Sequence, residues 1–285
     1  MTHAQLNVAI DIYISLTTIP GRSNTLRNTI IQLLKQDYPN IKAFIITIPT
    51  VNMRGLSFAT DIEDDYKWLE ALDTTRRIIV NRPEYDYGPC MKFIGAVPFL
   101  SATSKADTWV FVCDDDQMYL ENRISSQVAQ IKSPKHIVAR ATNLILQNFH
   151  PSFFGPMGFT GMLLPKQAIF EIDSFIRTRQ KDIPRCCKMN DDILIGTILY
   201  NAGYYFTADK HTKLEEVFVE GVHGYGENAL ASSYKNGAAK FFAMYTCHLH
   251  YNRRNAVGVV AILLTVFIII VTLAIAIPIA FSRRK

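Results

Sequence analysis

The stretch TWVFVCDDD, residues 108–116, sets three carboxylates directly after an unbroken apolar run. An apolar run of this length, rich in β-branched and aromatic residues, predicts a strand buried on both faces, as in the middle of a parallel sheet. In open α/β sheets ligands bind beyond the carboxyl ends of the strands. The stretch therefore predicts both a central strand and the edge of the sheet at which a site lies.

Strand and helix patterns alternate on either side of this stretch. This alternation predicts a mostly parallel α/β sheet flanked by helices, and no linker divides residues 1–252 into separate domains. The expected strands are 11–17, 42–48, 77–80, 108–113 and 204–208, and the expected helices are 23–35, 61–72, 91–100, 120–132, 166–177 and 191–201.

The acid triplet is the strongest candidate site. In an extended segment Asp114 and Asp116 point to one side, where two carboxylates suit a hard divalent cation and leave positions for diphosphate oxygens. The alternative is a solvated acidic turn. Three adjacent carboxylates repel one another unless a cation offsets them, which favours the functional interpretation.

A second acidic group opens the helix expected at 191–201. Asp191 and Asp192 follow an asparagine there, and acids at a helix N-terminus are also ordinary caps. One cap needs only one side chain, so the surplus carboxylate is a candidate general base for a substrate hydroxyl.

Four residues in loops at the same edge, and one in a later loop, are weaker candidates. Thr18 and Arg22 follow the first strand, and a guanidinium there suits phosphate, although a plain strand-to-helix turn is the alternative. Asp86 and Lys92 follow the third strand, where Lys92 either meets a phosphate or is a solvated lysine of a β-turn. His223 is a candidate third metal ligand, with a structural histidine as the alternative.

Other motifs are absent or ambiguous. No GKS/GKT phosphate loop, GxSxG elbow or GxGxxG fingerprint occurs, which argues against P-loop, hydrolase and dinucleotide-binding proteins. The GFTG segment at 158–161 gives either a close backbone approach to a sugar or a bend.

The net charge of +5 belongs to the C-terminal region. Five of the 30 basic residues follow position 252 and no acid follows Glu227, so residues 1–252 carry equal numbers of basic and acidic side chains. A neutral body is not typical of nucleic-acid binders, and we expect no nucleic-acid partner. The 26 uncharged residues at 256–281 predict a single transmembrane anchor of roughly 39 Å, followed by a short basic tail, 282–285.

The body is expected to face the cytosol. The N-terminus has no secretory signal, and none of the asparagines lies in a glycosylation sequon. Five cysteines without CxxC spacing suit free thiols in a reducing compartment.

Five short motifs occur in an order that resembles glycosyltransferases of the GT-A fold, and most closely small family-two-like enzymes of large DNA viruses and some microbes. The resemblance covers roughly residues 11–210. The motifs are SLTTIPGR (15–22), DYGPCMKF (86–93), VFVCDDDQMY (110–119), GFTGMLL (158–164) and KMNDDILIG (188–196).

The resemblance implies a metal-dependent transfer of sugar from a nucleoside-diphosphate sugar, with a UDP-sugar expected before a GDP-sugar. Asp114 and Asp116 match the DxD motif that holds Mn²⁺ or Mg²⁺, with Asp115 among the donor-binding residues. Asp192 matches the catalytic base, next to Asp191, and a base opposite the leaving group implies inversion. The segments lining the nucleotide pocket contain Thr18, Arg22, Asp86 and Lys92.

The implied acceptor is a glycan, a glycoprotein or a lipid, and the anchor would hold the enzyme near it. Two alternatives remain. One is a catalytically inactive, membrane-anchored structural or binding protein that keeps the fold. The other is a sugar-nucleotidyltransferase, although TTIPGR lacks the Gly-rich basic signature that a triphosphate needs.

Overall fold

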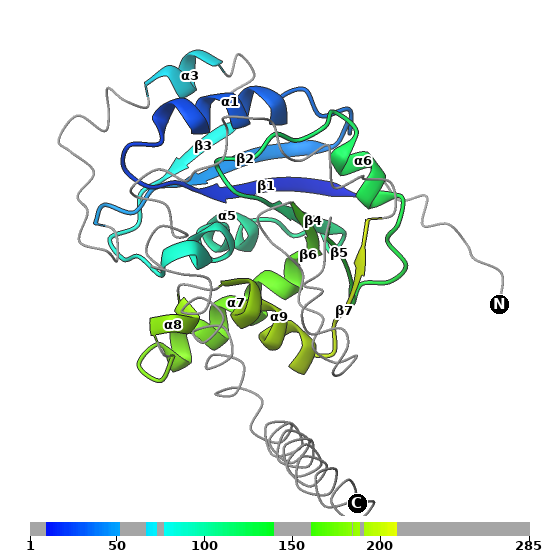
Figure 1. Cartoon of the computed structure of the whole chain (residues 1–285). Coiled ribbons are helices and arrows are strands. Elements are labelled where there is room, and N and C mark those ends of the chain that lie inside the picture. The colour runs from blue at the N-terminus through cyan, green and yellow to red at the C-terminus, as the bar shows by residue number, and fades with distance from the viewer. Residues whose placement is uncertain are drawn as a thin grey trace, which may run out of the picture.

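The computed structural model describes residues 10–51, 67–72, 77–139, 161–183, 185–188 and 191–209. In these residues a seven-stranded sheet lies between two layers of helices (Figure 1). The strands are β1 Asp11–Thr17, β2 Ile41–Thr47, β3 Ile78–Asn81, β4 Thr108–Val112, β5 His136–Ala139, β6 Met162–Pro165 and β7 Tyr205–Ala208.

The sheet has the order β3-β2-β1-β4-β6-β5-β7. Strands β1 to β4 are parallel where they pair, and β5 is parallel to β7, whereas β6 runs antiparallel to both β4 and β5. The expectation of a mostly parallel sheet is confirmed. Every strand except β6 consequently ends at the same edge, which is where the acid triplet follows β4.

The helices cover both faces of the sheet. Residues of α1, α3 and α6 belong to the apolar cluster on one face, and residues of α4, α5, α7 and α9 to the cluster on the other (Figure 1). The described helices are α1 Ser23–Leu33, α3 Trp68–Leu72, the 3₁₀ turn η1 Gly88–Cys90, α4 Met91–Ile94, α5 Val97–Ser101, α6 Arg123–Val128, α7 Lys166–Arg179, α8 Arg185–Lys188 and α9 Asp191–Asn201.

Strand β4 shows why the apolar stretch lies in the middle of the sheet. Its five residues are all buried. Val110 and Val112 pack with the α7 layer, while Trp109 and Phe111 pack with the α1 layer. Because successive side chains alternate between faces, both halves of the pattern have to be apolar.

The structure differs from the sequence predictions in several elements, among them α8, which was not expected, and the helix expected at 120–132, of which only Arg123–Val128 is helical. The helix expected at 91–100 is divided into α4 and α5, and Pro98 lies in the first turn of α5, where a missing N–H costs little. Strands β5 and β6 were not expected. Their four-residue runs, HIVA and MLLP, are too short to show a period.

Several predictions fall outside the described residues. These include the anchor at 256–281, the tail at 282–285, His223 and the segment 158–160. Among the residues that are described, no helix combines the length and the apolar character needed to cross a membrane.

The cysteines depart from the expectation of five free thiols. Cys90 and Cys113 are free and buried, but Cys187 is disulfide-bonded. The cytosolic orientation of residues 1–252 stays a prediction.

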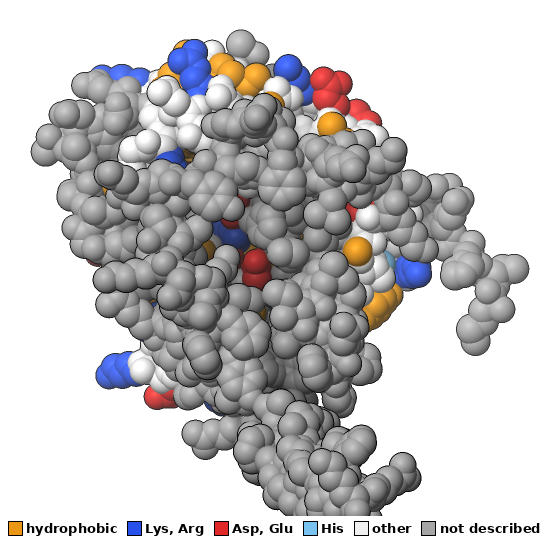
Figure 2. Space-filling view, in the orientation of Figure 1, with side chains coloured by type: hydrophobic (Ala, Val, Ile, Leu, Met, Phe, Trp, Pro, Cys, Tyr) orange, Lys and Arg blue, Asp and Glu red, His pale blue; other side chains and the backbone are white. Residues whose placement is uncertain are grey.

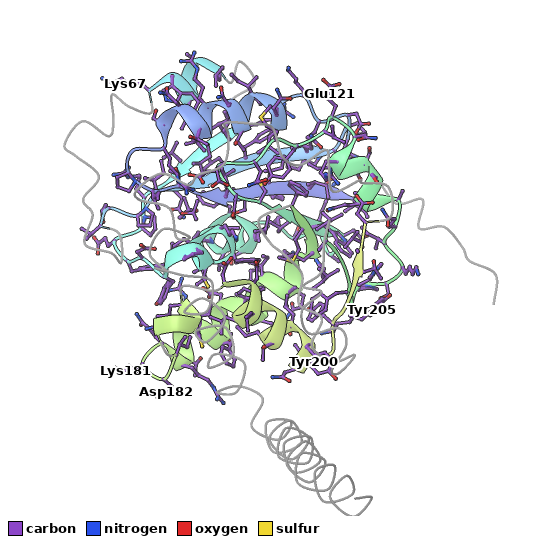
Figure 3. All side chains as sticks on the ribbon, viewed as in Figure 1. Lys67, Glu121, Lys181, Asp182, Tyr200 and Tyr205 are labelled. Atoms are coloured by element: carbon purple, nitrogen blue, oxygen red, sulfur yellow. The ribbon has the colours of Figure 1, made fainter. Side chains whose placement is uncertain are left out.

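Four of the charged side chains away from the carboxyl edge are labelled at the periphery in Figure 3. Lys67 and Glu121 are exposed beyond the α1 layer, and Lys181 and Asp182 are exposed after α7. These solvated charges are separate from the buried ones that follow β4.

Candidate functional site

The three aspartates after β4 differ in exposure. The side chains of Asp114 and Asp116 keep 30% and 14% of their accessible surface, whereas that of Asp115 keeps 3%. The first and third side chains are thus the more exposed ones, as expected, although Asp115 and Asp116 lie in a turn rather than in an extended segment. Asp114 and Asp116 are therefore the accessible carboxylates.

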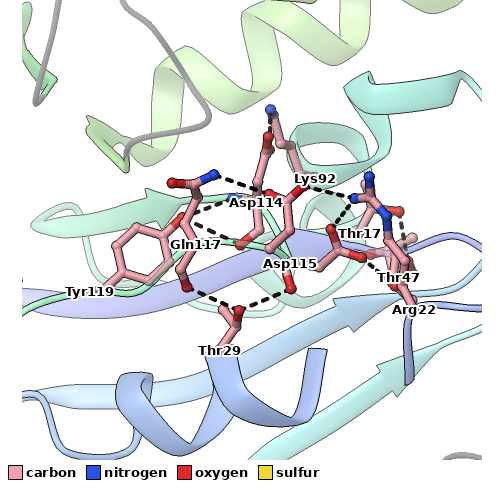
Figure 4. A network of polar contacts seen from close by, with 11 residues as sticks. Thr17, Arg22, Thr29, Thr47, Lys92, Asp114, Asp115, Gln117 and Tyr119 are labelled. Atoms are coloured by element: carbon pink, nitrogen blue, oxygen red, sulfur yellow. Dashed lines mark hydrogen bonds and ion pairs between the residues drawn. The ribbon is translucent and has the colours of Figure 1, made fainter. Parts of the chain in front are cut away.

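Asp115 is held from inside by three residues (Figure 4). Arg22 Nη1 lies 2.7 Å from Asp115 Oδ1, and the Thr18 hydroxyl donates a hydrogen bond to Oδ2. The Thr29 hydroxyl lies 2.9 Å from the Asp115 carbonyl oxygen. Thr18 and Arg22, expected to line a nucleotide pocket, thus connect the end of β1 to the acid triplet.

Asp116 lies between the same arginine and its neighbouring glutamine. Arg22 Nη1 is 3.2 Å from Asp116 Oδ2, and Gln117 Nε2 donates a hydrogen bond of 3.3 Å to Oδ1. Burial, together with the charges of Asp114 and Asp115, raises the pKa of Asp116 to about 6 against the opposing effect of Arg22. The raised pKa therefore reflects first the burial of this carboxyl group and then its two acidic neighbours.

Tyr119 fixes the backbone at the start of the triplet. The backbone N–H of Asp114 donates to the Tyr119 hydroxyl at 3.1 Å, and the Tyr119 ring packs edge-on against Phe111 with centroids 5.7 Å apart. Asp114 Oδ1 accepts a hydrogen bond of 2.7 Å from Lys92. Among the described residues no hydrogen bond reaches Asp114 Oδ2, which leaves this oxygen available to a ligand.

Lys92 lies deeper than the sequence indicated. The residue is 2% exposed, and its ammonium nitrogen is 2.7 Å from Asp114 Oδ1 and 2.7 Å from Asp191 Oδ2. Burial by itself would lower the pKa of Lys92, but the surrounding carboxylates raise it well above its usual value. The ammonium therefore stays charged and pairs with carboxylates on two different elements.

The acidic pair opens α9, as expected. Asp191 is 8% exposed and Asp192 is the more accessible of the two. Both lie in the first turn, where the helix dipole stabilises negative charge. Lys92 pairs with Asp191, and the more accessible Asp192 contributes a further negative charge near the same ammonium.

Carboxylates outnumber cations at this edge. Four described carboxylates contact two cations. Acidic and basic side chains lie next to each other near the middle of the face drawn in Figure 2. These four carboxylates carry two more charges than the two cations they contact, and Asp192 adds a further negative charge near Lys92, so an added divalent cation would be stabilised at this edge. The four carboxylates belong to Asp114, Asp115, Asp116 and Asp191, and the two cations are Arg22 and Lys92.

The donor set that the structure describes is incomplete for a metal. Within the described part of the chain, no three His, Cys, Asp or Glu residues are grouped as a metal site. Asp114 and Asp116 supply two carboxylates, and the expected third ligand, His223, lies outside the described residues. The carboxylate oxygens of the two aspartates are hard donors, which suit Mg²⁺ or Mn²⁺. These cations keep water or phosphate oxygens in their remaining coordination positions.

Asp86 shapes the loop after β3. Its Oδ1 accepts a hydrogen bond of 2.6 Å from the backbone N–H of Gly88, which has a positive φ of 64°. This is an Asx turn, and it delivers the chain into η1 and α4. Asp86 therefore helps to direct the segment that carries Lys92.

The two free thiols near the site are not activated. Burial raises the pKa of both Cys90 and Cys113, and the neighbouring aspartates raise it further. A nucleophilic cysteine needs the opposite shift, so covalent catalysis by these thiols is not supported.

Three residues that support the site were missed. Ser15 donates a hydrogen bond of 2.6 Å to the Lys92 carbonyl, Thr29 binds two carbonyls of the acid segment, and Tyr119 holds Asp114. Thr29 gave a signal, because it lies on the apolar stripe of α1 beside Leu26. A hydroxyl on a buried helix face needs a partner across the interface.

Comparisons with known proteins find likenesses among solved structures. No family model and no curated protein matches the chain. One similar solved structure is the mannosyltransferase PcManGT from Pyrobaculum calidifontis in complex with GDP-Man and Mn²⁺, with a TM-score of 0.48 and 12% identity. The match covers 71% of this chain but only 57% of that one. The likeness is too weak to carry a functional argument, so function is argued from the site.

The fold and the site together define a class. The chain is a mixed α/β protein with an acidic, oxygen-lined site at the carboxyl edge of a mostly parallel sheet.

Proposed function

We propose that this chain is a metal-dependent glycosyltransferase of the GT-A type that uses a nucleoside-diphosphate sugar. The observation that carries the proposal is the excess of carboxylates at the carboxyl edge, with Asp114 and Asp116 as the accessible ones. A diphosphate is itself anionic and would be repelled by such a site. A divalent cation between the carboxylates and the phosphates removes this conflict.

Asp114 and Asp116 would hold Mn²⁺ or Mg²⁺, with His223 as the proposed third ligand. The fit rests on their hard oxygens, on Asp114 Oδ2 having no described hydrogen-bond partner, and on the raised pKa of Asp116. When bound, the cation would neutralise the charge that develops on the departing diphosphate. Asp115 would act by fixing the triplet, because Arg22 and Thr18 occupy its carboxylate.

Asp192 is the proposed general base. It would take the proton of the acceptor hydroxyl as that oxygen bonds to the anomeric carbon of the sugar. The bond from that carbon to the phosphate oxygen breaks, and the nucleoside diphosphate leaves with the electron pair. Attack opposite the leaving group gives inversion.

The remaining parts of the proposal rest on the sequence. We propose a UDP-sugar before a GDP-sugar as donor, with Arg22 and Asp86 near the nucleotide. The acceptor would be a glycan, a glycoprotein or a lipid. The segment 256–281 would anchor the chain in a membrane by a single pass, with residues 1–252 on the cytosolic side.

Calorimetry on the full-length protein in mild detergent tests the proposal. UDP and GDP are titrated with Mn²⁺ and with a chelator, and UDP- and GDP-sugars are then screened for transfer. We expect binding of one nucleotide that needs the metal and weakens by more than about tenfold in Asp116→Asn. Asp107→Asn is the matched control, since Asp107 is exposed just before β4, at the opposite edge. Folded wild-type protein that binds neither nucleotide would overturn the proposal and favour an inactive, anchored protein.

A further inference from the structure

The ammonium of Lys92 joins the two acidic groups of the site. It lies 2.7 Å from an oxygen of Asp114, after β4, and 2.7 Å from an oxygen of Asp191, in the first turn of α9. The contact with Asp114 is an aligned hydrogen bond. The contact with Asp191 is a close ion pair but not an aligned hydrogen bond, since Asp191 Oδ2 has no described hydrogen-bond partner of good geometry.

The backbone of Lys92 is fixed as well. Its carbonyl oxygen accepts a hydrogen bond of 2.6 Å from the Ser15 hydroxyl in the middle of β1. One residue of α4 therefore contacts β1, the end of β4 and the start of α9, segments that are far apart in the chain.

Burial decides what this lysine can do. With 2% of its surface exposed and two carboxylates already in contact, the ammonium has no open side comparable to that of Asp114. A lysine that binds phosphate needs free N–H donors directed at the ligand. The geometry instead suits a charge that stays inside the protein and keeps two anionic elements together.

We infer that Lys92 is a positioning residue that ties the start of α9 to the end of β4 and so sets the distance between the metal carboxylates and Asp192. The inference rests on the proposed function for the roles of Asp114, Asp116 and Asp192. Without the ammonium, the largely buried carboxylate of Asp191 and the partly exposed carboxylate of Asp114 would face each other with no cation between them. Their repulsion would separate the two elements.

This inference predicts a specific pattern for Lys92→Met. The Mn²⁺ affinity should not fall, because Asp114 and Asp116 remain and lose a competing cation. The value of kcat should fall by about a hundredfold or more, since a small displacement of a base costs that much, while KM for the donor changes little. If Lys92 instead binds the diphosphate, the variant should lose nucleotide affinity.

A double-mutant cycle between Lys92→Met and Asp191→Asn tests the tie independently of catalysis. In urea unfolding of the full-length protein, Lys92→Met alone should lower the ratio of folded to unfolded protein about a hundredfold or more, because it leaves buried carboxylates without a counter-charge. Adding Asp191→Asn to Lys92→Met should raise the ratio of folded to unfolded protein again by at least about tenfold and should restore part of kcat. The matched control is Lys105→Met with Asp11→Asn, an ion pair of 2.8 Å whose lysine is 63% exposed, where the coupling should stay below about threefold.

The outcomes are distinguishable. The inference is supported if Lys92→Met and Asp191→Asn are coupled in the unfolding cycle and Lys92→Met keeps its Mn²⁺ affinity. Additive effects in the cycle, or lost nucleotide affinity that Asp191→Asn does not restore, overturn it. Failure of wild-type protein to bind a nucleotide with Mn²⁺ overturns the proposed function instead, while the unfolding cycle still reports on the tie.

Discussion

Lowering the pH from 7 to 5 should weaken Mn²⁺ binding about tenfold, because Asp116 must lose its proton to accept the cation. Its pKa is raised to about 6, first by burial and then by the charges of Asp114 and Asp115. A carboxyl group with a raised pKa keeps its proton to higher pH. The Mn²⁺ affinity is therefore at its full value well above pH 6, and it falls as the pH drops through 6.

The magnitude follows from the ionised fraction. With a pKa of about 6, roughly 0.9 of Asp116 is ionised at pH 7 and roughly 0.1 at pH 5, which gives the tenfold ratio. An aspartate with the ordinary pKa of about 3.9 would lose less than about a tenth of its ionised fraction over the same range. The two cases are far enough apart to separate in one experiment.

The assay is calorimetry at pH 7, 6 and 5 and constant ionic strength, in buffers of different ionisation enthalpy. At pH 5 each Mn²⁺ bound should release about 0.9 of a proton from Asp116, and at pH 7 about 0.1. In Asp116→Asn the remaining affinity should be weak and should not follow this pH dependence. Constant Mn²⁺ affinity from pH 7 to 5 in folded wild-type protein would refute the reasoning.

Three further predictions concern stability in urea unfolding. Gly161→Ala should cost about 3 kcal/mol, because an added Cβ would lie 2.5 Å from Phe111 Cζ at a φ of +90°. Gly203→Ala, at a φ of +82° with nothing within 4 Å, should cost only about 1 kcal/mol, and equal losses would contradict the packing argument. Burial lowers the pKa of His136 to about 4, so the folded state should lose about 2 to 3 kcal/mol as the pH falls from 6.5 toward 4, and His136→Gln should lack this loss. Thr29→Val should cost about 1 to 2 kcal/mol by removing the hydroxyl that binds two carbonyls of the acid segment, and an unchanged urea midpoint would show that those bonds contribute nothing.

Most of the sheet could be predicted because its signals are local. The strand Asp11–Thr17 was predicted at its observed bounds, and the expected helices at 166–177 and 191–201 correspond to α7 and α9. The first strand and α7 are long enough for their apolar periods to appear, whereas α9 is apolar on most sides and is indicated by its length and by Gly203 after its end. Strand β6 was missed because four apolar residues show no period, and its antiparallel direction depends on its neighbours β4 and β5.

The candidate site was predicted as a set of residues but not as a set of contacts. The sequence indicated at which edge of the sheet the site lies. The candidate residues described at that edge are acidic side chains or side chains that contact them. The sequence did not show that Arg22 and Thr18 bind Asp115, or that Lys92 is buried. Such pairings join residues separated by 22 to 97 positions, and no local pattern encodes which of several cations meets which carboxylate.

The sequence by itself determined the α/β class, the position of β4 and the acidic edge, because periodicity and the order of residues along one strand are properties of a short segment. Only the tertiary structure decided that Asp115 turns inward, that Asp114 and Asp116 stay accessible, and that Lys92 joins Asp114 to Asp191. The physical reason is that burial and ion pairing depend on which segments pack together, and that packing is settled by the whole fold rather than by any stretch of it.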